Sequence, residues 1–250
     1  MKKTLSKIKA FTLSEMVIAL GIIGVIAALT MPSVVYNVNN RANSALLNKA
    51  VVKLNEVVEL SMSESRFQPY PKCYYNRKNP GIRDFSQCKE LYAFMKENLR
   101  TIKICDENGV AEGCIPQYKG KDTVFKEQNP PPPSDSTQNE KDEYQKKLDG
   151  ATAGCESWSY DIMKTKPAIV TSDGITLIPY TNDFSSYPIF AVDVNGKKAP
   201  NRFGYDVFFL QLYGGEGEIP SFDAPVYCEY IEKGGYTTQE MMNFTKERFE

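Results

Sequence analysis

The stretch that decides the fold covers residues 16–36 and reads MVIALGIIGVIAALTMPSVVY. It carries no charged residue, and its length approaches the roughly 20 residues with which a helix crosses a bilayer. Four lysines crowd the residues before it, with no acid among them: Lys2, Lys3, Lys7 and Lys9. By the positive-inside rule these lysines hold the N-terminus in the cytoplasm, so we expect the rest of the chain outside it.

A secretory signal peptide is the alternative interpretation, because it also combines a basic start with an apolar run. Its cleavage site needs small residues, but Ala27 and Ala28 are followed by larger ones. Glu15 stands at the entrance of the run, where a carboxylate is costly and usually has a function. A Glu15 that simply faces water at the depth of the lipid headgroups is the plainer explanation of the same residue.

Residues 9–15, KAFTLSE, resemble the processing site of type IV prepilins and type II secretion pseudopilins. In that family a short basic leader is cut before a Phe, the new amino terminus is N-methylated, and a Glu follows four residues later. A Pro often lies near the outer end of the apolar helix. Phe11, Glu15 and Pro32 occupy these positions here, whereas Ala10 stands where the family prefers Gly.

The resemblance implies how the N-terminal part is processed. Residues 1–10 form a leader that prepilin peptidase removes between Ala10 and Phe11, and Phe11 is then methylated. Residues 11–36 form the transmembrane helix of the mature chain.

The resemblance also gives Glu15 a role. Cleavage leaves a charged amine on Phe11, which is expensive in an apolar environment unless it meets an anion. Glu15 lies one helical turn further on, and the resemblance implies that it pairs with the amine of a neighbouring subunit during assembly. Pro32 removes a backbone donor and predicts a kink, and the resemblance implies a helix that loosens between Gly24 and Pro32.

Beyond Pro32 the apolar residues keep a helical spacing of three and four residues. We expect an amphipathic helix over residues 37–65, continuing the transmembrane helix, and a second helix over about residues 85–99. The apolar face of the first comprises Leu46, Leu47, Ala50, Val51, Leu54, Val57 and Val58.

The C-terminal part carries the pattern of an antiparallel sheet. Residues 168–171 and 175–178 flank the turn sequence SDG, as in a hairpin, and further apolar runs cover residues 188–194 and 205–212. We expect about four strands whose inner face packs on the outer half of the long helix, which is an α+β fold. Residues 192–209 also resemble a C-terminal segment of many pilin-like proteins, so the resemblance implies the pilin-like form of this fold.

The expected extracytoplasmic domain spans residues 66–250. Its stretch over residues 126–150 contains four consecutive prolines and a polar tract, which predicts an exposed mobile loop. A tolerated insertion explains this stretch better than a partner-binding motif does.

Six cysteines and no histidine follow the apolar segment, and an even count outside the cytoplasm predicts disulfides. Free buried cysteines are the alternative, and zinc is disfavoured because there is no C-x-x-C and no His. Six cysteines allow several connectivities, which the sequence leaves open. The spacing favours Cys105 with Cys114, and then Cys73 with Cys88 and Cys155 with Cys228.

A calcium site is the one cofactor that the sequence raises. Asp193, Asn195 and Asp206 offer hard oxygens, and some members of the family that the chain resembles bind calcium in this region. However, Lys197 occupies a ligand position of the usual calcium loop. Asx residues in a tight turn are the commoner explanation of the same pattern.

No catalytic constellation stands out. Without His the chain cannot build a Ser-His-Asp or Cys-His arrangement, and it contains no P-loop, G-x-S-x-G or H-E-x-x-H motif. No feature selects the two carboxylates that a glycosidase requires. We therefore expect a protein that is not an enzyme, and an extracytoplasmic hydrolase is the weakest hypothesis.

The charge balance argues against general nucleic-acid binding, because 30 basic residues fall to 26 without the four N-terminal lysines, against 31 acidic ones. The sequence instead predicts a structural subunit of a type IV pilus or type II secretion pseudopilus, with the large domain leaning toward a minor component. Its partners are then other pilin or pseudopilin subunits, contacted through the N-terminal helix, and its place the bacterial inner membrane and later the filament. The alternative is a single-pass membrane-anchored protein whose outer domain binds a ligand or a surface.

Overall fold

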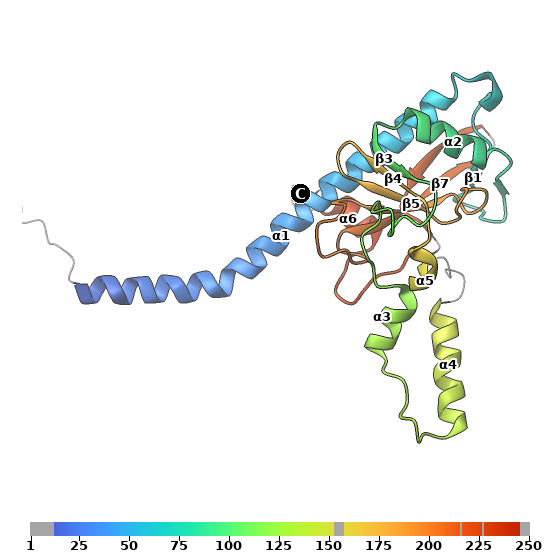
Figure 1. Cartoon of the computed structure of the whole chain (residues 1–250). Helices are drawn as coiled ribbons and strands as arrows, with labels where there is room; N and C mark the ends of the chain where they lie inside the picture. Colours follow the sequence, from blue (N-terminus) through green and yellow to red (C-terminus); the bar gives the residue numbers. More distant parts are fainter. Residues whose placement is uncertain (1–12, 153–157, 216, 227, 246–250) are drawn as a thin grey trace, which may run out of the picture. The chain divides into compact units, whose positions relative to one another are not determined.

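The residues that the computed structural model describes are 13–152, 158–215, 217–226 and 228–245. The chain divides into two compact units, Met1–Arg41 and Ala42–Glu250. Helix α1 (Leu13–Ser61) supplies the whole described part of the first unit and the first helical segment of the second (Figure 1). The long N-terminal helix expected from the sequence is therefore present, and the helix continues through Pro32.

The second unit is built on one eight-stranded sheet. Neighbouring strands follow the order β3-β4-β5-β6-β7, and β7 also pairs with β1 and β8. The pairing of β1 with β7 is parallel, whereas the other pairings are antiparallel. The strands are β1 (Tyr74–Tyr75), β2 (Arg83–Asp84), β3 (Thr101–Cys105), β4 (Ala168–Thr171), β5 (Thr176–Pro179), β6 (Ile189–Asp193), β7 (Val207–Gly215) and β8 (Glu218–Asp223).

The α+β class and the β4–β5 hairpin are confirmed, but the antiparallel sheet of about four strands is wrong, because the sheet is larger and mixed. The strands β1 and β2 have two residues each, which is too short for an alternating pattern. The strand β8 contains Pro220, a residue that predicts against a strand and is tolerated at a sheet edge.

Among the described residues, the second unit also contains five further helices and the 3-10 turn η1. Helix α2 confirms the predicted second helix, and the expected amphipathic helix ends at Ser61, short of residue 65. The elements are η1 (Ser65–Phe67), α2 (Cys88–Asn98), α3 (Lys121–Gln128), α4 (Gln138–Thr152), α5 (Tyr160–Met163) and α6 (Thr238–Asn243).

Both faces of the sheet are covered, so every residue of β7 is buried. Side chains alternate across a strand, and Phe208 and Leu210 therefore join the face on which α1 and α2 pack, whereas Phe209 joins the opposite face with Trp158. The α1 residues on the first face are those of the predicted apolar stripe: Leu47, Ala50, Leu54, Val57 and Val58.

The edge of the sheet at β8 is closed by a side chain of α1. The amide of Asn55 accepts from the backbone N of Phe222 (2.6 Å) and donates to its carbonyl oxygen (3.4 Å). These are the two hydrogen bonds that a further strand would make, so Asn55 fixes α1 against the sheet and blocks strand addition at this residue.

The stretch expected as a mobile loop over residues 126–150 instead contains most of helix α4, so the expectation of a loop is corrected. Thr137 and Glu140 form a capping box at its start, with Glu140 N donating to Thr137 Oγ1 (3.4 Å) and Thr137 N to Glu140 Oε2 (2.8 Å). Figure 1 shows α3 and α4 side by side as an arm that projects from the sheet. The rings of Phe125 and Tyr144 join the two helices at 6.0 Å.

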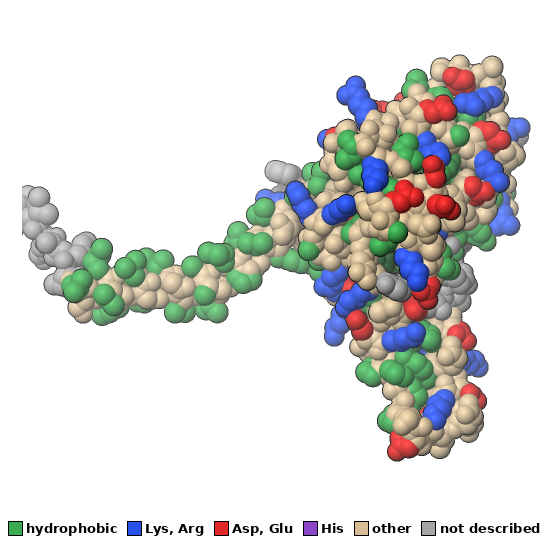
Figure 2. All heavy atoms as spheres, viewed as in Figure 1, with side chains coloured by type: hydrophobic (Ala, Val, Ile, Leu, Met, Phe, Trp, Pro, Cys, Tyr) green, Lys and Arg blue, Asp and Glu red, His purple; other side chains and the backbone are tan. Residues whose placement is uncertain are grey.

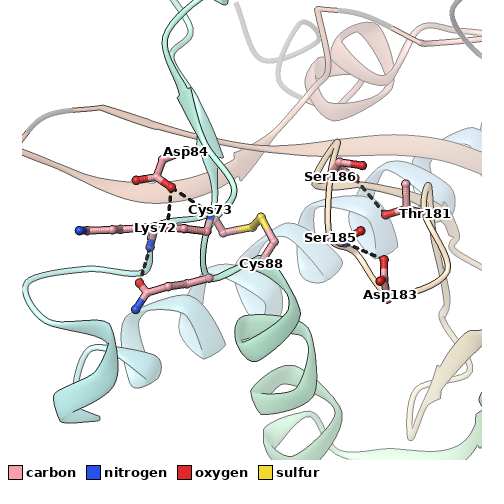
Figure 3. The surroundings of a disulfide bond; sticks show 10 residues. Lys72, Cys73, Asp84, Cys88, Thr181, Asp183, Ser185 and Ser186 are labelled. Carbon is pink, nitrogen blue, oxygen red and sulfur yellow. Dashed lines mark hydrogen bonds between the residues drawn. A yellow bond between two sulfur atoms is a disulfide. The ribbon is translucent and has the colours of Figure 1, made fainter.

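Two of the favoured disulfides are present: Cys73–Cys88 and Cys105–Cys114. Figure 3 shows the first at the start of α2, with the loop hydrogen bonds Ser185 N to Asp183 and Thr181 Oγ1 to Ser186 O drawn nearby. The third favoured pair involves Cys155, which lies outside the described residues.

The packing of α1 on the sheet predicts unequal effects of two neighbouring substitutions. Leu54→Ala removes a side chain that is 1% exposed and should cost about 2–5 kcal/mol of unfolding free energy. Val52→Ala, at a side chain that is 55% exposed, should cost less than about 0.5 kcal/mol. Urea unfolding of the full chain in mild detergent measures both through Trp158, the only tryptophan, and equal effects would contradict this packing.

Candidate functional site

The described part of the first unit is an apolar helix surface with one carboxylate near its start. Glu15 lies in the first turn of α1 and is the only charged residue between Leu13 and Asn40. The mean hydropathy of the most apolar 18-residue window of α1 is 2.3, and none of that window is buried. The helix is thus long and apolar enough to cross a membrane, and Figure 2 shows hydrophobic side chains along this part of it.

The structure describes some of the sequence-predicted residues of this segment and not others. Ala10 and Phe11 lie outside the described residues. Gly24 lies on an open part of the helix, with no heavy atom within 4 Å of an added Cβ. The loosening of the helix between Gly24 and Pro32 stays a prediction.

In the second unit, the β6–β7 connection brings the three calcium candidates together at one end of the sheet. Asp206 is fully buried and accepts from the backbone N of Asn201 (2.8 Å), the backbone N of Arg202 (2.7 Å) and the side chain of Asn195 (3.2 Å). Both of its oxygens are therefore occupied by donors, and Asp206 fixes the loop around it. Burial raises the pKa of the Asp206 carboxyl, although these donors oppose the rise.

Asp193 ends β6 and is also fully buried. It accepts from the hydroxyl of Tyr118 (2.5 Å) and from the backbone N of Asn195 (3.1 Å). Burial raises the pKa of Asp193 to about 8, and the nearby Asp206 adds to the rise. The hydroxyl of Tyr118 thus ties the segment before α3 to the end of β6.

These contacts decide against calcium. The residues offer two carboxylates, of which Asp206 is saturated by N–H donors and Asp193 accepts from Tyr118 and from the backbone N of Asn195. One buried acceptor, Asn195 Oδ1, has no hydrogen-bond partner, but one amide oxygen does not make up the six to eight oxygens that calcium takes. Among the described residues, no group of three or more acidic, His or Cys side chains could hold a metal ion.

Asp206 acts as a loop clamp if its only role is to accept from the backbone N–H groups of its loop. A loop clamp and a calcium site predict different effects of calcium on the stability of the protein. The melting temperature of the full chain should be the same with excess calcium and with chelator. Asp206→Asn should lower the unfolding free energy by about 2 kcal/mol, since the amide nitrogen replaces one of the two oxygens and cannot accept from the backbone N–H group that it faces. A calcium-dependent rise in melting temperature that is lost in Asp206→Asn would contradict the clamp.

Lys166 is a buried amine that the sequence did not single out. Its side chain is 1% exposed, donates to the carbonyl oxygen of Tyr180, and places Nζ 5.5 Å from the ring centre of Trp158. Burial lowers the pKa of Lys166 from 10.5 to about 8. Lys166 precedes β4 and nothing in its neighbours marks it as buried, so only the tertiary structure reveals it.

Because burial lowers the pKa of Lys166, replacing this residue should change the free energy of unfolding by an amount that depends on pH. The folded protein releases the Lys166 proton at lower pH than the unfolded chain, so the cost of burying the charge is largest below about pH 8 and disappears above about pH 10.5. Lys166→Met should therefore stabilise the protein at pH 7 by about 1–3 kcal/mol, and the gain should vanish as pH rises.

Urea unfolding of Lys166→Met against the parent chain at several pH values measures this difference. Lys164→Met, at a side chain that is half exposed, is the matched control and should show no such trend. A gain that is independent of pH would mean that burial does not lower the pKa of Lys166.

No family model, curated protein or solved structure matches the chain.

Proposed function

We propose that the chain is a pilin-like structural subunit of a type IV pilus or type II secretion pseudopilus. One observation carries the proposal: the exposed apolar part of α1, residues 13–40, has Glu15 in its first turn as its only charged residue. Residues 1–10 are a leader, and prepilin peptidase cuts between Ala10 and Phe11. Residues 11–36 then anchor the chain in the inner membrane until it enters the filament.

The chemistry of the helix start supports an assembly role for Glu15. Removal of the leader gives Phe11 a charged amine, and an unpaired charge is costly both in lipid and in a bundle of apolar helices. Pairing between the Glu15 carboxylate of one subunit and the Phe11 amine of its neighbour removes both costs at once. Because the two groups are four residues apart, this pairing sets the axial offset between neighbouring subunits.

The second unit supports a position outside the cytoplasm. Two disulfides, Cys73–Cys88 and Cys105–Cys114, are typical of oxidising compartments. The four N-terminal lysines point the same way, since they favour a cytoplasmic N-terminus. In this proposal the domain has a structural role, with α1 as the element that joins it to the filament core.

Glu15→Ala tests the proposal, with Glu15→Gln as the variant that keeps the size but removes the charge. Both should lower incorporation into sheared filaments at least about tenfold, because an unpaired Phe11 amine is left among apolar helices. Membrane insertion and domain folding should stay unchanged. The neighbouring Ser14→Ala is the matched control and should assemble normally.

If Glu15→Gln assembles normally, the proposed pairing between the Glu15 carboxylate and the Phe11 amine is wrong. If no filament fraction of native cells ever contains the protein, the membrane-anchored binding protein becomes the better proposal.

A further inference from the structure

The tip of the α3–α4 arm presents a polyproline segment. Residues 130–133 are four consecutive prolines joined by trans peptide bonds, and Pro131 is exposed. Proline fixes φ near −65°, and a following proline excludes the helical region, so the segment takes the extended polyproline II conformation. This "proline tip" comprises residues 129–136.

The proline tip is held in place by helix α4. The hydroxyl of Tyr144 donates to the carbonyl oxygen of Asn129 (2.9 Å), and Nζ of Lys141 donates to that of Ser134 (2.8 Å). Little conformational entropy is therefore left to lose when the tip binds a partner, which favours recognition.

A hollow lined by tyrosines lies elsewhere on the same chain, where β1 and β2 meet the segment before β6. The two tyrosines that line it, Tyr75 and Tyr187, have their ring centres 6.2 Å apart, and the buried Tyr180 packs against Tyr187 at 5.4 Å. Tyr187 is 43% exposed. This "tyrosine hollow" is lined by Tyr75, Pro80, Gly81, Arg83, Tyr187 and Gln211.

Tyr187 adopts a backbone conformation that is rare for its type. Its φ is +52°, in the left-handed region that bulky side chains avoid. The loop before it is fixed by the bond from Thr181 Oγ1 to Ser186 O (3.0 Å) and by the ion pair of Asp183 with Lys89 (2.8 Å). Such strain clusters at ligand clamps, where it holds a side chain ready for a partner.

The two surfaces have complementary charge. The strand and turn that border the tyrosine hollow carry the exposed basic residues Arg83 and Lys78. The proline tip and the start of α4 carry the exposed acidic residues Asp135, Glu140 and Glu143. Opposite charge on two surfaces steers them together and fixes their register.

We infer that the proline tip of one copy binds in the tyrosine hollow of a second copy. Polyproline segments bind grooves lined with aromatic rings, because the extended segment is preformed and its ring faces pack on them. In Figure 1 the arm projects away from the sheet and lies well apart from β1, so the two surfaces do not meet within one chain.

The contact joins two different patches, so it is heterologous and propagates into a ring or an open helical array. It therefore deepens the proposed filament function and rests on it: the α1 helices form the filament core, and the arm links neighbouring domains.

Photo-crosslinking in native membranes and filaments tests the inference with the full chain. A benzophenone derivative of phenylalanine at Tyr187 keeps an aromatic ring in the hollow. It should give covalent dimers in which the captured peptide is residues 129–136 of a second copy. The same probe at Ile219, which is 53% exposed on β8, is the control and should not capture this peptide.

Charge reversal gives a second measure of the same contact. Arg83→Glu and Asp135→Arg should each lower the yield of the dimer at least about fivefold, and the double variant should restore it. Filaments without this crosslink, capture of a different protein at Tyr187, or no rescue by the double variant would overturn the inference. If the crosslink forms but no filament fraction contains the protein, the contact between copies is supported and the proposed filament function is wrong. The failure of the contact and the failure of the filament function are therefore distinguishable.

Discussion

The apolar surface of α1 has to be covered, and nothing in the described part of the first unit covers it. Fifteen large hydrophobic side chains between Leu13 and Val38 are exposed, each by more than a third of its surface. Burying one such side chain contributes about 1.5–3 kcal/mol, so together they exceed the 5–15 kcal/mol that stabilises a typical domain. This segment is therefore suited to an apolar environment.

The exposed apolar surface bears on two other features of α1: the charge of Glu15 and the change in composition along the helix. Glu15 is the only charge on the segment, so its carboxylate must meet a cation or water. The following turns of the same helix change their composition, and Leu47 and Leu54 enter the core of the α+β domain. The first part of this helix therefore has an exposed apolar surface, and the apolar side chains of its second part are buried in the domain. The spacing of the apolar residues along the sequence changes accordingly.

The features that the sequence predicted depend on local patterns. The three- and four-residue spacing of α1, the β4–β5 hairpin and the short separation of Cys105 and Cys114 are all visible within a few residues. The sequence did not reveal β1, which is defined by its parallel pairing with a strand more than a hundred residues away. Helix α4 was missed because the prolines and polar composition hid a capping signal at Thr137 and Glu140.

The same distinction applies to the candidate sites. Asp193, Asn195 and Asp206 were singled out by residue type, and the structure brings them together, but their donors and burial give them a structural role instead of calcium binding. Lys166 and Tyr187 carry no signal in the sequence. The burial of Lys166 and the left-handed backbone of Tyr187 arise only from tertiary packing.

The central claim is that the apolar helix of a processed subunit begins at Phe11. Mass spectrometry of the N-terminal peptide, taken from protein isolated from native cells, tests it most directly. The account predicts a mature chain that starts at N-methylated Phe11. An intact Met1, or a chain cut after Ala27 or Ala28, would contradict it.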